Sequence, residues 1–466
     1  MKISFHGAAR TVTGSKHLLR LDNGIQVLFD CGMFQGMGQQ TDELNRNFGF
    51  NPEEVTFLLL SHAHIDHCGL IPKLVKEGFR GKIFCTSATK DLAAILLEDS
   101  AVIQRDDTKY LNRKREKKGL PFFEPMYNLD DVANSLKLFE VIEYDKWFSL
   151  NSDIEVLYTD AGHIIGSAVV SVKIKENGKT TALTFSGDVG RYGDVILRSP
   201  EVFPKADYVI CESTYGNKLH DVVHNSIDTL LDCVKKTCIQ KKGNLIIPAF
   251  SVGRTQELLF WFNKMEHENR LPKLKYFVDS PLSSEATMVV KKHTADYNSS
   301  VKQLMQEDKD PFAFEGLMYV ESAEDSKKIN EYPYPCVIIS ASGMADAGRV
   351  KHHIKNNISD AKNTILLVGY CSPFSLGGKL ANGVKKVNIY GDEFTVVAEV
   401  GQMRSMSAHG DYDDLCKFLS CQQPAEVKKL FLVHGEYDVQ QDFEARLENK
   451  GFDVEIPAMH QQFSLD

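Results

Sequence analysis

The sequence predicts an α/β protein of two units, in which a parallel α/β unit is inserted into a unit based on β-sheets. The chain has 466 residues, which is too many for one ordinary hydrophobic core. Short apolar runs that end in polar or glycine-rich turns fill about the first 215 residues, as in a protein of many strands. From residue 216 helices and strands alternate, and the short-strand pattern returns after residue 394. We therefore expect units at 1–215 plus 395–466 and at 216–394.

Apolar runs bounded by turn residues define the expected strands of the first region. The runs are 25–29, 57–60, 168–172 and 182–185, and the N-terminal segment 1–7 is expected to be a strand that enters a loop. Polar residues suited to chemistry stand on the loops that follow, namely Asp30, His62, His163 and Asp188. Loops on a rigid sheet commonly carry functional side chains, so we expect a site there.

The inserted region begins with a helical pattern that leads into an apolar run, and this order repeats. We expect helices at 226–242 and 255–267 and strands at 244–248, 275–278, 336–340 and 364–368. A further strand is expected at 428–434, in the returning first unit.

Composition is that of an ordinary globular protein, with 43% hydrophobic and 25% charged residues. No run of 18 apolar residues is present, so we expect no membrane span. The ten cysteines form no Cys-x-x-Cys pair. Scattered cysteines are typical of reduced thiols in a cytosol, so we expect a cytoplasmic protein without a thiolate zinc site.

The net charge of −9 does not indicate a nucleic-acid binder, although a nuclease needs positive charge only along its substrate groove. Residues 101–120 are a local exception, with a formal net charge of +4 from seven basic and three acidic side chains. A solvated basic helix face and a surface that steers phosphates both explain this segment, and the sequence leaves both open.

The strongest chemical signal is the segment 61–69, which places three histidines and one aspartate within six residues. Imidazole nitrogen and carboxylate oxygen are the usual ligands of hydrolytic zinc. In an extended or tightly turned segment His62 and His64 project the same way, and the pair Asp66 and His67 can face a second metal around the turn. A chance cluster of polar surface residues would not be expected to be this dense.

Two later residues extend this pattern. Taken alone, His163 in its glycine-flanked loop is more often structural, and Asp188 between glycines is by default a turn residue. Their order along the chain, after the histidine-rich segment, instead favours a role for both residues in a metal site. The sequence here resembles the metallo-β-lactamase superfamily, whose motifs match at Asp30, at His62, His64, Asp66 and His67, at His163 and at Asp188.

This resemblance implies an αββα sandwich with two Zn²⁺ ions at one edge. It implies that His62, His64 and His163 bind the first ion, that Asp66 and His67 bind the second, and that Asp188 bridges them. Asp30 is similar to the family's aspartate that orients the histidine loop without binding metal. That role is physically reasonable, because a histidine ligand needs its other ring nitrogen held.

Three further motifs resemble those of the β-CASP branch of nucleases. The segment 211–217 resembles motif A with Glu212, 407–411 resembles motif B with His409, and 432–436 resembles motif C with His434. The match runs in order over nearly the whole chain and is most similar to bacterial and archaeal relatives of the endonuclease subunit of the cleavage and polyadenylation specificity factor. The resemblance implies that His434 completes the second zinc site and that the inserted α/β β-CASP domain caps the metal cleft.

Two segments of the insert are expected to contact substrate phosphate. Ser342 and Gly343 follow a strand and are expected to open a helical stretch, whose free backbone N–H groups attract anions. Ser251 and Arg254 have the same strand-to-helix layout, with a guanidinium that can pair with phosphate. An ordinary helix cap beside a surface arginine is the alternative for each segment.

The implied function is a zinc-dependent ribonuclease in RNA processing. A hydroxide that bridges the two metals would attack the phosphodiester, and Asp66 is expected to be essential to that centre. His409, held cationic by Glu212, would protonate the leaving oxygen, which gives 3′-hydroxyl and 5′-phosphate ends. RNA is therefore the expected partner. Many members of the family dimerise, so a homodimer is one expected assembly, although no residue indicates it.

Three alternatives remain open at this stage. A thioesterase or lactamase of the same superfamily shares the first motifs but needs neither Glu212 with His409 nor a large insert. A DNA-directed nuclease of the β-CASP branch usually differs at the position of His409. A non-catalytic RNA-binding or scaffolding protein typically lacks metal ligands, and every ligand position here is filled. The sequence does not decide between internal and 5′-to-3′ cleavage.

Overall fold

The computed structural model describes residues 1–466 apart from 221–225, 370, 404–405 and 466. The chain divides into two compact units, Met1–Leu219 with His409–Asp466, and His220–Ala408. The second unit therefore interrupts the first in sequence. Among the described residues no helix is long and apolar enough to cross a membrane.

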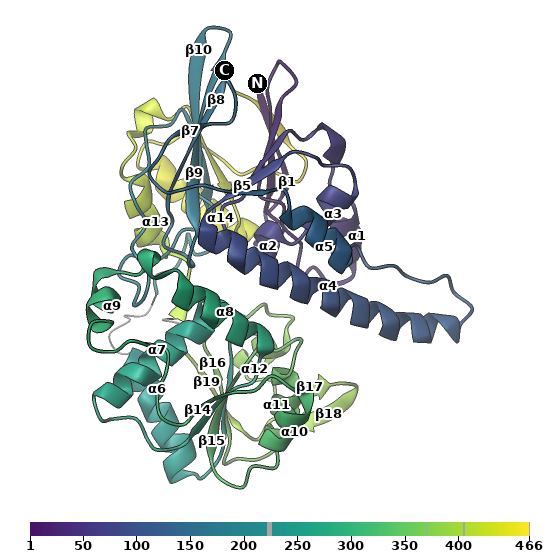
Figure 1. Cartoon of the computed structure of the whole chain (residues 1–466), viewed down its shortest axis with the longest axis vertical. Helices are drawn as coiled ribbons and strands as arrows, with labels where there is room; N and C mark the ends of the chain where they lie inside the picture. The colour runs from purple at the N-terminus through teal and green to yellow at the C-terminus, as the bar shows by residue number, and fades with distance from the viewer. Residues whose placement is uncertain (221–225, 370, 404–405, 466) are drawn as a thin grey trace. The chain divides into compact units, whose positions relative to one another are not determined.

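The first unit contains two seven-stranded sheets, which lie face to face in Figure 1. The first sheet has the order β22-β1-β2-β3-β4-β5-β6, and its strands are β1 (Lys2–Gly7), β2 (Lys16–Arg20), β3 (Gln26–Phe29), β4 (Phe57–Leu59), β5 (Lys82–Cys85), β6 (Phe139–Val141) and β22 (Gln462–Ser464). The second sheet has the order β21-β20-β11-β10-β9-β8-β7, and its strands are β7 (Phe148–Ser149), β8 (Ile154–Asp160), β9 (Ala168–Glu176), β10 (Lys179–Phe185), β11 (Tyr208–Glu212), β20 (Lys429–Val433) and β21 (Val454–Glu455).

Helices cover the outer faces of both sheets (Figure 1). Those of the first sheet are α1 (Thr41–Arg46), α2 (Ile65–Cys68), α3 (Ile71–Lys76), α4 (Ser87–Glu116) and α5 (Leu129–Leu136), with the short 3₁₀ turns η1 (Gly38–Gln40) and η2 (Pro52–Glu54). Those of the second sheet are α13 (Tyr412–Leu419) and α14 (Tyr437–Glu448), with η7 (Pro424–Glu426). The predicted αββα sandwich is confirmed.

The central strands are buried on both faces. In β20, Phe431 and Val433 point into the core between the two sheets, whereas Leu430 and Leu432 pack against α13 and α14. A strand buried on both faces must be apolar at every position. This requirement explains why the sequence shows continuous apolar runs here rather than an alternating pattern.

The parallel strands bring distant loops to one edge of the sandwich. In the first sheet β3, β4, β5 and β6 are parallel neighbours, and in the second sheet β10, β11, β20 and β21 are parallel neighbours. Carboxyl ends of parallel strands lie at the same edge, where open α/β sheets commonly bind ligands. The loops after β3, β4, β10 and β20 carry Asp30, His62, Asp188 and His434, and Glu212 is the last residue of β11.

The second unit is a parallel α/β domain, as predicted. Its six-stranded sheet has the order β14-β13-β15-β12-β16-β19, and every neighbouring pair is parallel. The strands are β12 (Leu245–Pro248), β13 (Lys275–Val278), β14 (Leu317–Tyr319), β15 (Cys336–Ser340), β16 (Thr364–Leu367) and β19 (Glu399–Gln402). The hairpin β17 (Lys386–Ile389) and β18 (Asp392–Thr395) forms a separate ribbon.

The helices of this unit alternate with its strands. They are α6 (Ser226–Val234), which continues into the π-helix η4 (Lys235–Gln240), α7 (Arg254–His267), α8 (Pro281–Lys292), η5 (Thr294–Asp296), α9 (Ser299–Leu304), α10 (Ala323–Ile329), α11 (Val350–Asn357) and α12 (Leu376–Ala381).

Two sequence-based expectations differ from this structure. The second unit extends beyond residue 394, because β19 pairs with β16 and belongs to its sheet. Ser342 and Gly343 do not open a helix, because the loop 341–349 separates β15 from α11 and the helix begins at Val350. The predicted helix N-terminus at these two residues is therefore wrong.

Candidate metal centre

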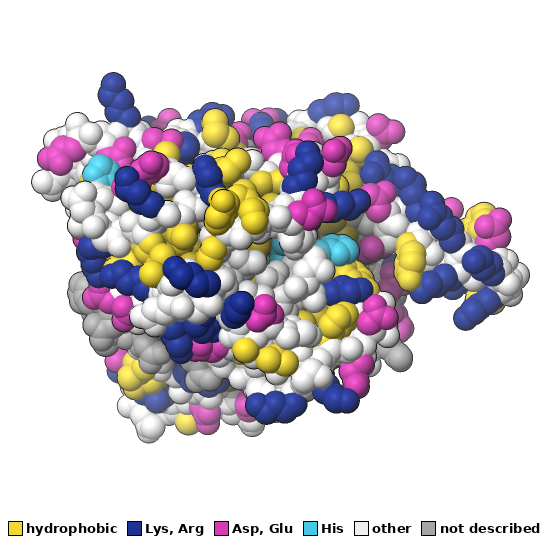
Figure 2. All heavy atoms as spheres, turned by 90° about the horizontal axis from the view of Figure 1, so that it is seen from below, with side chains coloured by type: hydrophobic (Ala, Val, Ile, Leu, Met, Phe, Trp, Pro, Cys, Tyr) yellow, Lys and Arg dark blue, Asp and Glu magenta, His cyan; other side chains and the backbone are white. Residues whose placement is uncertain are grey.

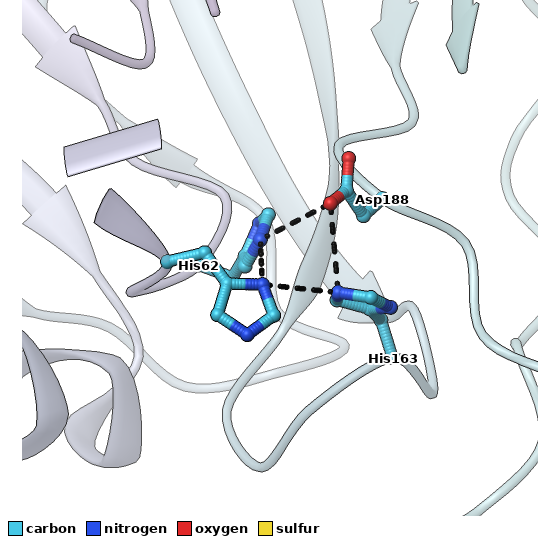
Figure 3. A group of neighbouring side chains, drawn as sticks. His62, His163 and Asp188 are labelled. Atoms are coloured by element: carbon cyan, nitrogen blue, oxygen red, sulfur yellow. Dashed lines mark hydrogen bonds and ion pairs between the residues drawn. The ribbon is translucent and has the colours of Figure 1, made fainter. Parts of the chain in front are cut away.

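Four ligand atoms from three loops of the first unit converge on one point. The loop after β4 provides His62 and His64, the β8–β9 loop provides His163, and the loop after β10 provides Asp188. His64 Nδ1 lies 3.1 Å from His62 Nε2 and 3.2 Å from His163 Nε2. Asp188 Oδ2 lies 3.4 Å from His62 Nε2 and 3.5 Å from His163 Nε2. Figure 3 shows His62, His163 and Asp188 facing one another in this arrangement.

These separations fit a bound metal ion. In a tetrahedral zinc site with bonds of about 2.0–2.1 Å, neighbouring ligand atoms stand roughly 3.3 Å apart. The three imidazole nitrogens cannot satisfy one another by hydrogen bonding alone, because a neutral imidazole has only one N–H donor. A cation at their common centre removes that conflict. His62, His64, His163 and Asp188 therefore form a set that could hold a metal, here called the first ligand set.

A second ligand set adjoins the first and consists of Asp66, His67 and His434. Asp66 Oδ2 lies 3.3 Å from His434 Nε2 and 4.0 Å from His67 Nε2. The other oxygen of Asp188, Oδ1, lies 3.2 Å from His67 Nε2 and 3.6 Å from His434 Nε2. Asp188 thus directs one carboxylate oxygen to each set.

His67 Nε2 in the second set and Asp188 Oδ1, which faces it, are buried and make no hydrogen bond, although they lie 3.2 Å apart. Leaving a buried polar atom unsatisfied costs about 1–3 kcal/mol. A metal ion coordinated by both atoms would compensate that cost, so these unsatisfied atoms fit the metal site that the donor set predicts.

Asp30 lies behind the ligands and touches none of the converging atoms. Its Oδ2 accepts a hydrogen bond from His67 Nδ1 at 2.7 Å, and its two oxygens accept from Ser61 N at 2.8 Å and Ser61 Oγ at 2.9 Å. Asp30 is fully buried and has a backbone φ of 57°. Aspartate and asparagine tolerate this left-handed conformation better than most residues.

These hydrogen bonds determine which nitrogen of each histidine faces the point where a metal could bind. Because His67 Nδ1 donates to Asp30, its Nε2 is the ring nitrogen that faces Asp66 and Asp188. Burial acts against the charge of His67, but Asp188, Asp30 and Asp66 outweigh it and hold its pKa well above the usual value, so a metal bound there would displace the proton on Nε2. Ser61 Oγ donates to Asp30 and lies 3.0 Å from His62 Nδ1, so it accepts from that nitrogen and leaves His62 Nε2 as the ligand atom. One carboxylate therefore orients a histidine in each ligand set.

Thr214 performs the corresponding task for His434. Its Oγ1 lies 3.0 Å from both His434 Nδ1 and the His434 carbonyl oxygen. A hydroxyl has one proton, so both contacts are satisfied when Thr214 donates to the carbonyl and accepts from Nδ1–H. His434 Nε2 is then the ring nitrogen that faces Asp66 at 3.3 Å and could bind a metal. His434 also has a positive φ of 52°, and its backbone N–H donates to the Ala8 carbonyl oxygen at 2.7 Å.

Glu212 and His409 form a pair beside the two ligand sets. His409 Nδ1 donates to Glu212 Oε1 at 3.1 Å and lies 3.9 Å from Asp188 Oδ2. Glu212 is fully buried at the end of β11, where its Oε1 also accepts from Val189 N at 2.6 Å. The His409 backbone pairs with Gly190, next to the Asp188 loop. His409 also groups with Asp188 and His434 as a third potential ligand cluster.

The surroundings set the protonation states of these histidines. Burial, reinforced by the nearby His67, lowers the pKa of His62 to about 3, and burial lowers the pKa of His64 to about 4. Both are therefore neutral at pH 7, as metal ligands must be. Burial acts against the charge of His409, but Glu212 outweighs it and raises the pKa of His409 to about 9. His409 is consequently cationic at neutral pH in the protein without metal.

Close backbone contacts hold the loops of the centre together. A Cβ atom on Gly32 would lie 1.6 Å from the carbonyl oxygen of Asp66, and one on Gly190 would lie 1.8 Å from the carbonyl oxygen of Gly162, next to His163. A side chain at either position would displace a loop that carries a ligand. These two glycines are therefore required by packing around the centre.

The predicted phosphate-contacting residues all lie in the second unit, at the ends of the neighbouring strands β12 and β15. Their two loops touch, because Gly343 packs against the ring of Phe250. Arg254 is the first residue of α7, but its guanidinium is buried and paired with Glu257. Contact with phosphate would therefore require Arg254 to share or leave that carboxylate. Ser251 is buried in the loop before α7.

The supporting hydroxyl groups of Ser61 and Thr214 were missed by sequence reasoning, although both residues adjoin predicted site residues. Serine and threonine are common on loops, and nothing in the sequence shows that these two face a histidine. Their positions directly before His62 and two residues after Glu212 were the available signal.

Comparisons with known proteins agree with this geometry. The chain matches the Metallo-beta-lactamase superfamily over residues 15–87, the Beta-Casp domain over 255–380 and the Zn-dependent metallo-hydrolase RNA specificity domain over 393–457. It is 35% identical over 436 residues to Ribonuclease TTHA0252 of Thermus thermophilus, covering 94% of this chain and 93% of that protein.

Two further relatives are longer proteins. Transcription termination factor FttA of Methanocaldococcus jannaschii is 30% identical over 457 residues, which cover 95% of this chain and 68% of FttA. Cleavage and polyadenylation specificity factor 73 of Drosophila melanogaster is 27% identical over 434 residues, covering 92% of this chain and 59% of that factor.

Proposed function

This chain belongs to the β-CASP family of the metallo-β-lactamase superfamily, and we propose that it is a two-zinc ribonuclease that hydrolyses RNA phosphodiester bonds to leave 3′-hydroxyl and 5′-phosphate ends. The observation that carries the proposal is the pair of ligand sets joined by Asp188, with a buried glutamate–histidine pair beside them. A thioesterase releases a thiolate, which can leave without a proton, whereas the 3′ alkoxide leaving group of RNA needs one, and this pair could supply it.

The first set would hold one zinc through His62, His64 and His163, and the second set would hold the other through Asp66, His67 and His434. Asp188 would contribute one oxygen to each, as its distances to both sets support. When bound, the ions would supply Lewis acidity, lowering the pKa of water toward about 7 and stabilising negative charge on the phosphoryl oxygens.

His409 would donate the proton that the leaving 3′ oxygen requires. Its Nδ1 is engaged by Glu212, so the transfer would use the other ring nitrogen. The raised pKa of about 9 keeps the proton on the ring at neutral pH until the leaving group takes it. Glu212 is a positioning residue in this scheme, because its carboxylate orients the ring and stabilises its charge.

Substrate phosphates would contact Ser251, Arg254, Ser342 and Gly343 in the second unit. The adjacency of their two loops at neighbouring strand ends supports this assignment. We also propose a cytoplasmic location, which the ten unpaired cysteines support.

An end-labelling experiment tests the function. RNA labelled separately at its 5′ and 3′ ends is incubated with the purified protein, with chelator, and with chelator followed by zinc. Asp66→Ala removes a ligand, and Asp130→Ala on the exposed start of α5 is the matched control. We expect cleavage that chelator abolishes, zinc restores, Asp66→Ala loses and Asp130→Ala retains. Cleavage that persists with chelator or in Asp66→Ala would refute the proposal.

The two labels also report the mode of cleavage. Internal cleavage gives fragments that carry either label, whereas 5′-to-3′ cleavage releases the 5′ label as a mononucleotide. Phosphatase sensitivity of the new 5′ ends checks the predicted end chemistry.

A further inference from the structure

The second half of α4 and the segment that returns along it form an arm that projects from the first unit (Figure 1). We call residues 101–126 the basic arm. Within it only Ala101 and Thr108 are buried, whereas Tyr110 is 58% exposed and Phe122 is 67% exposed. An arm that buries so little apolar surface contributes little to the hydrophobic core of the unit.

Specific polar contacts nevertheless give the basic arm a defined shape. Asn112 pairs with the backbone of Phe123 through two hydrogen bonds of 2.8 and 2.9 Å. Nearer the body of the unit, Arg46 donates to the Glu124 carbonyl at 3.0 Å and its guanidinium lies 4.4 Å from the centre of the Phe123 ring. The returning segment is therefore fastened to the helix and to the sandwich.

One face of the helical part carries a row of cations. Arg105, Lys109, Arg113 and Lys117 follow one another at intervals of four residues, which places them about 6 Å apart along the helix. Figure 2 shows Lys and Arg side chains crowded along the projecting arm. Like charges spaced four residues apart destabilise a helix. The last part of the row lies at the C-terminal end of α4, where cations are favoured by the helix dipole, so these repelling side chains are held in one exposed row that an anionic partner could neutralise.

The ion pairs of the basic arm neutralise only the start of this row. Asp106 lies 2.9 Å from Arg105 and 3.5 Å from Lys109. Arg113 and Lys117 have no ion-pair partner among the residues that the structure describes. Residues 101–120 carry a formal net charge of +4 within a chain of −9, so the remaining residues together carry −13. The arm is therefore a basic projection on an acidic protein.

Exposed aromatic rings accompany the cations. Tyr110 stands three residues before Arg113 on the same helix surface, and Lys114 Nζ lies 4.3 Å from the centre of its ring. Phe122 lies on the returning segment. Proteins that hold single-stranded nucleic acid combine a basic track for the backbone with aromatic rings on which bases stack. A purely acidic protein partner would not require exposed rings beside the cations.

We propose that the basic arm binds single-stranded RNA, with the cation row on its phosphates and Tyr110 and Phe122 stacked on its bases. This inference rests on the proposed ribonuclease function, because it assigns an RNA-binding surface away from the metal ligands. The arm would increase the residence time of long substrates and would not act on the bond that is cleaved.

Binding is measured in the Asp66→Ala background, where cleavage is blocked, by fluorescence anisotropy of an unstructured labelled RNA at several salt concentrations. The test variant is Lys109→Ala, Arg113→Ala and Lys117→Ala together. The control replaces three exposed lysines of the same unit by alanine, namely Lys137, Lys146 and Lys175, and so makes the same change in net charge.

We expect the arm variant to raise the Kd about tenfold or more and to lower the slope of log Kd against log salt concentration by about 2, since each phosphate contact on single strands contributes about 0.7. The control should stay within about twofold of the parent. Tyr110→Ala with Phe122→Ala should raise the Kd about fivefold or more with an unchanged salt slope, whereas Trp147→Ala on another exposed surface should not.

An unchanged Kd in the arm variant, or an equal loss in the lysine control, would overturn the inference. The inference would also be overturned if the arm variant kept its RNA affinity but lost binding to phosphatidylserine vesicles, which would make the partner a membrane. The same holds if the variant kept its RNA affinity but lost a dimer in sedimentation, which would make the partner a second copy of the chain. Hydrolysis of bis(p-nitrophenyl) phosphate by the zinc-loaded enzyme reports on the metal centre alone. That activity should survive in the arm variant, and its absence from the parent would count against the proposed function instead.

Discussion

Replacing Asp30 by asparagine should weaken metal binding at the proposed second zinc site while leaving the backbone in place. Asparagine has nearly the same shape and tolerates the positive φ of 57° at this position. Its amide has one acceptor oxygen, whereas the carboxylate accepts from His67 Nδ1 on one oxygen and from Ser61 N on the other. Either orientation of the amide therefore places an N–H donor against another N–H donor.

The expected decrease in zinc affinity follows from the lost hydrogen bond between His67 and Asp30. The 2.7 Å hydrogen bond from His67 Nδ1 to a carboxylate is charge-assisted, and such bonds contribute about 1.5–3 kcal/mol. Loss of a partner behind a metal ligand typically lowers metal affinity about 10–100-fold, which corresponds to about 1.4–2.7 kcal/mol. We expect this loss at the site of Asp66, His67 and His434. The first set should lose less, because Asp30 reaches it only through Ser61.

Competition with a chromophoric zinc chelator measures both sites in one titration of the metal-free protein. Asp30→Asn should show one site near the parent affinity and one weakened site. Asp130→Asn, an exposed carboxylate on α5, is the control and should match the parent. If both sites of Asp30→Asn keep the parent affinity, or both weaken equally, the assignment of Asp30 to His67 is wrong.

Three other predictions concern Thr214, the pair of His409 and Glu212, and the buried His6. Thr214→Val should lower zinc affinity about 10–100-fold by releasing Nδ1 of His434, and Thr214→Ser should restore it in the same competition assay. His409→Ala and Glu212→Gln should each slow RNA cleavage by about 10²–10⁴-fold while the zinc content measured by mass spectrometry stays at the parent value; zinc lost with activity would make His409 a ligand. Burial lowers the pKa of His6 to about 3, so the unfolded chain binds a proton below pH 6.5 that the folded protein does not, and stability is complete above pH 6.5 and falls as the pH drops toward 3. When the pH is lowered from 7 to 5.5, the free energy of unfolding measured with urea should fall by about 1 kcal/mol less in His6→Gln than in the parent. Equal decreases in the two proteins would contradict this prediction.

Much of the first unit was predictable because its central strands are buried on both faces. The expected strands at 57–60 and 428–434 correspond to β4 (Phe57–Leu59) and β20 (Lys429–Val433), since continuous apolar runs leave little freedom in the assignment. The boundary of the second unit was less predictable. Its edge strand β19 has the sequence Glu-Val-Gly-Gln and no fully buried residue, so it produces no apolar run.

The residues that converge on the candidate metal centre could be predicted from their spacing and from family resemblance. Their arrangement in space could not be predicted. Nothing in the sequence shows that the two oxygens of Asp188 face different ligand sets, because this depends on how five strand ends meet. The hydroxyl partners Ser61 and Thr214 were missed for the same reason. The prediction that a helix begins at Ser342 was wrong because serine and glycine are common both in helix caps and in irregular loops.

Zinc content and RNA cleavage measured on the same preparations test the central claim most directly. The two ligand sets predict two zinc ions per chain in the parent protein by mass spectrometry, and one in Asp66→Ala, with RNA cleavage lost together with the second ion. A parent protein that binds no zinc, or a metal-free preparation that cleaves RNA at the parent rate, would contradict the account.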